Sequence, residues 1–231
     1  LFAIPLWLQN VLGLSPISSG LVLLWLAGGA FVASGVGGAL SGKLPAHRAV
    51  QLGVMLELIG VAGIGFFASP DLGWAGVAPF LFVYGIGIGL ATAQLTGVIM
   101  VDVPMEKIGQ GSGSQSTVRQ IGSALGIAVL GTVLFTGTQV SFEDKLAGLN
   151  VETSQSVILV DAVVESAGGA IPQLSEGLQA QQVPAAIADE IQLAAGESFT
   201  DGAKWASLAA ALFLLLGFAS TFNLSSRVRK D

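Results

Sequence analysis

The chain has 231 residues, of which 52% are hydrophobic and 10% are charged, and its formal net charge is −6. Soluble domains carry about 25% charged residues, so this composition excludes an ordinary soluble domain and indicates a membrane protein. There is no cysteine and one histidine, His47, which excludes disulfides, thiolate metal sites and multi-histidine metal sites.

Six apolar segments follow one another along the chain. A helix needs about 20 residues to cross the core of a bilayer, and five segments reach that length. They are residues 20–40, 49–68, 76–100, 117–137 and 204–224. The first segment, residues 1–12, is shorter and is expected to be the end of a truncated helix. The pattern predicts an all-α polytopic membrane protein.

Lysines and arginines in short connections predict the orientation of the spans, because they are retained on the cytoplasmic side. Basic residues follow the second, fourth and sixth segments, namely Lys43, Arg48, Lys107, Arg227, Arg229 and Lys230. The connection 138–203 instead has ten acids and Lys145 as its one basic residue. We therefore expect a plasma-membrane protein with a cytoplasmic tail, residues 225–231, and a long acidic external loop, residues 138–203.

Two stretches of the acidic loop have helical character. VILVDAVVESAGG is too short to span a membrane, and PAAIADEIQLAAG is expected to be a helix that Pro184 begins and Gly196 closes. Short amphipathic helices and a solvated, partly disordered loop are both compatible with this composition.

The connection between the second and third segments reads GGALSGKLPAHRAVQLG. It resembles the loop motif of the major facilitator superfamily, with Gly38, Lys43, His47 and Arg48 at matching positions, although an acid and a second glycine of that motif are missing. The resemblance implies a latch on the inner face. Ordinary retention of positive charge on that face is the alternative reading.

Three further features resemble the 14-span drug:proton antiporters of that superfamily. They are the opening PLWLQNVLGLSPISSGLVLLWLAGG, the stretch 109–135 with its Arg-Gln-x-Gly, and the long loop before the last span. The resemblance implies the C-terminal six-helix bundle of a major facilitator fold, with its first helix truncated and the N-terminal bundle of the same protein missing. It also implies proton-coupled export of hydrophobic or amphipathic compounds by alternating access, with protons and the lipid bilayer as partners and without nucleic acid.

Four polar side chains are candidates for a substrate cavity. Tyr84 and Gln94 are ten residues apart, so they fall roughly on one face of the fourth segment, which lines the cavity in the resembled fold. Gln9 is expected at the outer mouth. Arg119 is expected to point into the bundle or its inner mouth, and a snorkelling position at the membrane surface is the alternative.

Glu57 stands in the middle of the third segment. A carboxylate in hydrocarbon is costly, so it is a possible proton or cation site. A protonated or snorkelling structural glutamate is the alternative, and the resemblance favours it because the third helix of each half lies at the periphery.

Glycines four residues apart lie on one helical face and allow close packing of a second helix. Gly85 and Gly89, and likewise Gly122 and Gly126, have this spacing. The first pair belongs to a GIGIG run that is expected to be a packing surface. Anchoring at the membrane interface is the role expected for most of the four tryptophans, Trp7, Trp25, Trp74 and Trp205.

The alternatives to export are an intramembrane enzyme and a non-transporting membrane protein. An intramembrane enzyme needs a paired acid, a Ser-Lys pair or a metal set within the spans, where the charged residues are Glu57 and Arg119. We therefore expect neither enzymatic activity nor a cofactor or metal. A non-transporting membrane scaffold or sensor remains the alternative to an exporter.

Overall fold

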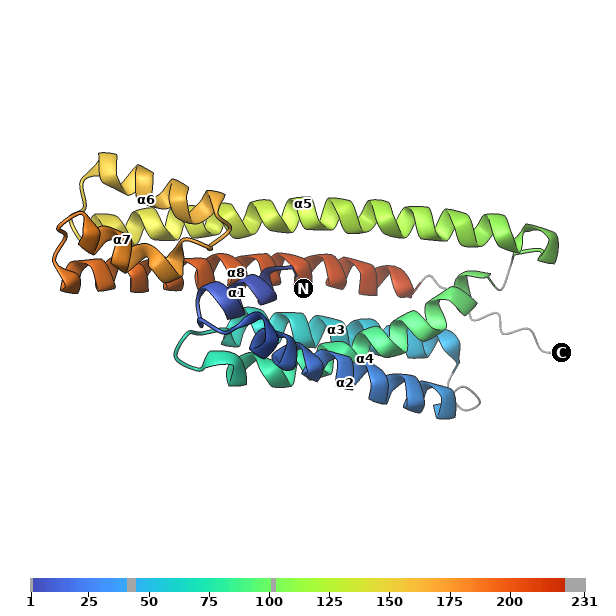
Figure 1. The fold of residues 1–231 in the computed structure, drawn as a ribbon. Coiled ribbons are helices and arrows are strands. Elements are labelled where there is room, and N and C mark those ends of the chain that lie inside the picture. Colours follow the sequence, from blue (N-terminus) through green and yellow to red (C-terminus); the bar gives the residue numbers. More distant parts are fainter. Residues whose placement is uncertain (1, 41–44, 101–102, 223–231) are drawn as a thin grey trace. The chain divides into compact units, whose positions relative to one another are not determined.

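The computed structural model describes residues 2–40, 45–100 and 103–222, and these residues form helices without any strand (Figure 1). In chain order the elements are α1 (Ala3–Asn10), α2 (Pro16–Leu40), α3 (Ala46–Phe67), α4 (Gly73–Met100), η1 (Met105–Lys107), α5 (Ile108–Gly148), α6 (Thr153–Glu165), η2 (Ile171–Gln173), α7 (Leu174–Ala180) and α8 (Ala185–Thr221).

Five of these helices, α2, α3, α4, α5 and α8, are long and apolar enough to cross a membrane. Many of their large apolar side chains are exposed on the protein surface, including Phe31 at 81% and Phe66 at 70%. A soluble protein does not expose so much apolar surface to water, so lipid is its natural environment. The expected all-α polytopic membrane protein is confirmed.

Two helices are longer than the apolar segments within them. Helix α5 continues beyond residue 137 to Gly148, and α8 begins at Ala185 and passes through Gly196 without ending there. The expected helix end at Gly196 is therefore wrong. Residues 138–203 are largely helical because their acids alternate with good helix formers and with buried side chains such as Phe142 and Phe199.

The chain divides into two compact units, and the division crosses the long helices. The first unit comprises Leu1–Val22, Ile64–Val77 and Val129–Ala209. The second unit comprises Leu23–Gly63, Ala78–Ala128 and Ala210–Asp231. Each unit has its own buried side chains.

In the second unit, α4 packs between α2 and α3 through its GIGIG run. A Cβ atom added at Gly89 would lie 2.8 Å from the carbonyl oxygen of Ala30 in α2, and one at Gly85 would lie 3.1 Å from the Ala30 nitrogen. A Cβ atom at Gly87 would lie 2.6 Å from the carbonyl oxygen of Gly53 in α3. Gly85 and Gly89 thus face α2, whereas Gly87 faces α3, because residues two apart point to nearly opposite sides of a helix.

In the first unit, the end of α5 and the start of α8 run side by side, and α6 and α7 lie beside them (Figure 1). A Cβ atom at Gly202 of α8 would lie 2.9 Å from the Thr138 nitrogen of α5, so the two backbones are in direct contact. The core of this unit is apolar and includes side chains that are almost wholly buried, namely Phe142, Leu146, Val160, Val163, Ala188, Ile191, Ala195 and Phe199. Residues 138–203 are therefore a folded helical segment rather than an open loop.

Candidate functional site

The crossing of α3 and α4 brings Glu57 and Tyr84 together. A Cβ atom at Gly87 would lie 2.7 Å from the Glu57 Cγ, and one at Gly60 would lie 2.8 Å from the Tyr84 Cα. Each large polar side chain therefore packs on a glycine of the other helix. Both side chains are half-buried. The pair is a polar site in an otherwise apolar crossing.

Gln94 and Arg119 belong to the same unit but lie away from that crossing. Gln94 is half-buried, further along α4 than Tyr84. Arg119 is exposed on α5, one turn after Gln115, whose side-chain amide donates a 3.3 Å hydrogen bond to the Thr96 hydroxyl of α4. The structure thus places the start of α5 beside the end of α4, with Gln94 and Arg119 on neighbouring helices.

Gly122 and Gly126 have no packing partner among the described residues. No atom outside their own turn of helix lies within 4 Å of a Cβ added at either position. The proposed packing of this α5 face against another helix stays a prediction, and its partner would come from outside the chain described here.

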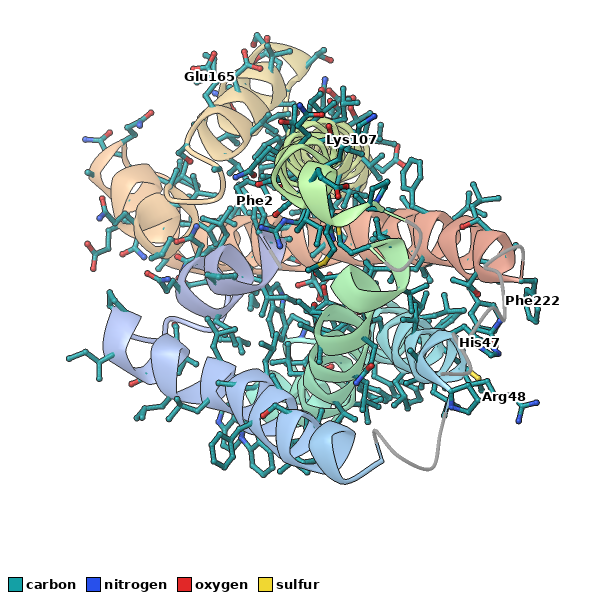
Figure 2. All side chains as sticks on the ribbon, turned by 90° about the vertical axis from the view of Figure 1, so that its right-hand side faces the viewer. Phe2, His47, Arg48, Lys107, Glu165 and Phe222 are labelled. Carbon is teal, nitrogen blue, oxygen red and sulfur yellow. The ribbon has the colours of Figure 1, made fainter. Side chains whose placement is uncertain are left out.

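The inner loop motif is only partly within the described residues. His47 is half-buried and Arg48 exposed in the first turn of α3, where Figure 2 shows the Arg48 side chain projecting away from the helix. Gly38 is in α2, and Lys43 lies outside the described residues, as do Arg227, Arg229 and Lys230 of the expected tail. Gln9, in α1, is half-buried and belongs to the first unit rather than to the unit that holds Tyr84.

Trp7 has a different role from the interfacial anchoring expected for most of the tryptophans. Its side chain is 1% exposed, and its indole N–H donates a 2.9 Å hydrogen bond to the buried hydroxyl of Thr200 in α8. One turn further along α1, the Asn10 side-chain amide donates a 3.0 Å bond to the carbonyl oxygen of Ala167. These two bonds hold α1 to the segment 138–203, and no pattern in the sequence predicts either partner.

A charged cluster that the sequence reading did not single out joins α5 to α8. The Lys145 ammonium lies 3.1 Å from Asp201 Oδ2 and 3.3 Å from Glu197 Oε2. The Ser141 hydroxyl donates a 2.9 Å hydrogen bond to the same Asp201 oxygen, and Lys204 Nζ lies 3.9 Å from the other. Glu197, Asp201 and Lys204 recur every three or four residues, which is the one pattern that predicts a shared helical face.

The described residues contain no group of three or more His, Cys, Asp or Glu side chains that could hold a metal ion. What they offer instead is a half-buried polar pair on an apolar crossing, in a bundle whose outer surface suits lipid. A sequence profile of the Major Facilitator Superfamily matches residues 1–127. The chain belongs to the Major Facilitator Superfamily.

Relatives within the superfamily cover nearly all of the chain. It is 30% identical over 218 residues to the multidrug resistance protein Stp of Mycobacterium tuberculosis, an alignment that covers 92% of this chain and 38% of that protein. It is 31% identical over 223 residues to the multidrug efflux pump LfrA of Mycolicibacterium smegmatis, covering 95% and 41%. It is 29% identical over 220 residues to the tetracenomycin C resistance and export protein of Streptomyces glaucescens, covering 93% and 40%.

This superfamily member therefore spans about two fifths of the length of each of these relatives. No solved structure is significantly similar to the chain. The resemblance to drug exporters, read from the sequence motifs, is confirmed at the level of the family. The roles of individual residues stay predictions.

Proposed function

We propose that this chain forms one helical bundle of a proton-coupled exporter of hydrophobic or amphipathic compounds, which works by alternating access. The proposal rests on similarity to known exporters. Proteins named as multidrug efflux and antibiotic export proteins align with nine tenths of the chain or more. Their shared superfamily places substrate sites between two bundles that rock about the middle of the membrane. A second bundle from the same protein is then the partner of this one.

The second unit supplies the polar groups that such a function needs. Tyr84 and Gln94 of α4 are half-buried and offer a hydroxyl and an amide to a substrate within apolar surroundings. Few polar groups in an apolar cavity suit hydrophobic and amphipathic ligands, because the polar groups fix orientation while apolar contact supplies affinity. Gln9 is proposed for the outer mouth of the pathway.

Glu57 is the candidate proton site. Its side chain packs at the α3–α4 crossing against Gly87, three residues along α4 from Tyr84, where a change of protonation alters the charge of an apolar contact. The Glu57→Gln variant keeps the shape of the protonated side chain and cannot ionise, so it loses proton-driven efflux if Glu57 is the proton site. Full proton-driven efflux by this variant at normal membrane abundance would instead make Glu57 a structural residue.

Arg119 is proposed to pair with an acceptor from the partner bundle. Its side chain is exposed, and the glycines that follow it leave one α5 face open for close approach. A guanidinium can hold two acceptors at once, and an ammonium lacks this planar fork.

Dye efflux tests the proposal. The whole protein that contains this chain is expressed in cells lacking their own exporters, and ethidium loss is followed by fluorescence at matched membrane abundance. We expect efflux that a protonophore stops, weaker efflux for Tyr84→Ala and Gln94→Ala, and clearly slower efflux for Arg119→Lys. Efflux that persists with protonophore refutes proton coupling, and a fully active Arg119→Lys variant refutes the role of the guanidinium.

A further inference from the structure

The first unit contains an open cavity of about 600 Å³ that the proposed transport site does not use. Its walls come from the connection after α1, the connection between α3 and α4, η2, the middle of α8, and Lys145 of α5. All of these segments belong to the first unit. Volumes of about 300–1,000 Å³ are typical of cavities that hold a drug-sized molecule.

The charges in the cavity are almost, but not fully, balanced. Lys145 of the charged cluster contacts the carboxylates of Glu197 and Asp201, and Lys204 contacts that of Asp201. The two lysines and two acids together carry no net charge. Asp71, in the α3–α4 connection, also lines the cavity and is exposed. It takes part in none of the ion pairs found within the described parts of the chain.

The remaining wall is partly apolar. Leu12, Pro70, Ile171 and Leu193 line it, and the Leu193 side chain is 69% exposed. An exposed leucine and a carboxylate without an ion-pair partner, lining the same cavity, can contact the two parts of an amphipathic cation. An anion of similar size is disfavoured, because both lysines already have carboxylate partners.

We propose that this cavity binds a drug-sized amphipathic molecule with one positive charge, placing the charge near Asp71 and the apolar body against Leu193 and Ile171. The site is separate from the polar pair of the second unit. It goes beyond the proposed transport, since binding here requires neither a proton gradient nor a rocking motion. A molecule bound here would contact residues of the first unit and neither Tyr84 nor Gln94.

Charge variants test which carboxylate attracts the ligand. Ethidium, an amphipathic monovalent cation, is titrated into the chain in lipid nanodiscs, and the signal of empty nanodiscs is subtracted. Exposed charge pairs are weak, so Asp71→Asn is expected to weaken ethidium binding about threefold, and the reversed charge in Asp71→Lys about tenfold. The matched control is Asp144→Lys on α5, whose exposed carboxylate lies outside the cavity; its affinity should change less than twofold.

Protection from labelling locates the bound dye. The native sequence has no cysteine, so Leu193→Cys and Ile187→Cys each introduce a single thiol on an exposed position of α8. Leu193 lines the cavity and Ile187 does not. Ethidium is expected to slow maleimide labelling of the Leu193→Cys variant at least threefold and to leave that of Ile187→Cys unchanged.

Three results would overturn the cavity proposal: no ethidium binding, equal affinity for the chain and its Asp71→Lys variant, or equal labelling of both thiols with and without dye. Each is read from binding in nanodiscs. A failure of the whole protein to export ethidium would refute the proposed function and leave these readings unchanged.

Discussion

Glycines at the α3–α4 crossing decide where two large polar side chains can lie. Gly87 faces Glu57, and Gly60 faces Tyr84, so each helix offers a gap to the bulky residue of the other. Close helix approach of this kind is favoured in membranes, where association depends on packing rather than on removing apolar surface from water. The same glycines that bring the helices together therefore also position the candidate proton site.

Adding one methyl group at this crossing is expected to destabilise the bundle. A Cβ atom at Gly87 would lie 2.5 Å from the Glu57 backbone nitrogen, which cannot move independently of α3. Overpacking of this kind costs about 1–3 kcal/mol, so Gly87→Ala should lower the unfolding temperature in detergent. Gly97→Ala on the same helix is the control, because nothing lies within 4 Å of its Cβ position. Equal unfolding temperatures for the two variants would contradict the described packing.

The buried bond between Trp7 and Thr200 permits a second test at the level of single residues. Thr200→Val keeps the side-chain shape but leaves the indole N–H without an acceptor, which costs about 1–3 kcal/mol for a buried donor. The exposed Thr136→Val serves as control. Thermal unfolding of Trp7→Phe, Thr200→Val and the double variant should show that the double loss is smaller than the sum. Additive losses would mean that the two side chains do not interact.

The length of a helix and the length of its membrane-crossing part are different properties. Hydropathy predicts only the membrane-crossing part. The apolar segments read from hydropathy fall almost entirely within α2, α3, α4, α5 and α8. Hydropathy could not show that α5 and α8 extend beyond their apolar segments, because Glu143, Asp144 and Glu190 are unfavourable in lipid yet acceptable in a helix exposed to water. The expected helix end at Gly196 was wrong because glycine ends a helix only where the backbone leaves the helical conformation, and at Gly196 α8 continues.

A substitution at Gly196 tests the continuity of α8. A Cβ atom there would meet the Val11 Cγ1 at 3.5 Å, an ordinary contact, so Gly196→Ala should keep or raise the stability, by up to about 1 kcal/mol. Circular dichroism and thermal unfolding in detergent give the measurement. If a helix did end at this residue, in the left-handed conformation that favours glycine, alanine would instead lower the stability.

For the whole molecule, the family could be recognised from motifs, whereas the polar contacts could not. The Arg-Gln-x-Gly run, the basic connections and the long loop before the last span are local patterns that survive in the sequence. The bonds of Trp7 with Thr200 and of Lys145 with Glu197 and Asp201 join segments far apart in the chain. Such pairs depend on how helices fold back on one another, which a single sequence does not state.

Thiol labelling tests the expected orientation of the chain. Ile158 of α6 and Met105 of η1 are both strongly exposed, at 68% and 82%, and belong to connections predicted on opposite sides. In sealed cells an impermeant maleimide should label Ile158→Cys at once and Met105→Cys only after permeabilisation. Equal labelling of both before permeabilisation would contradict the alternation of the spans.

The central claim is that the protein containing this chain exchanges protons for amphipathic compounds, and reconstituted transport tests it most directly. The whole protein is placed in proteoliposomes with an acidic lumen, and ethidium, whose charge does not depend on pH, is added outside. Antiport predicts that protons leaving the lumen drive ethidium inward, and that collapse of the pH gradient by an ionophore releases it. Uptake that is equal with either direction of the gradient, or no greater than in protein-free liposomes, would contradict the claim.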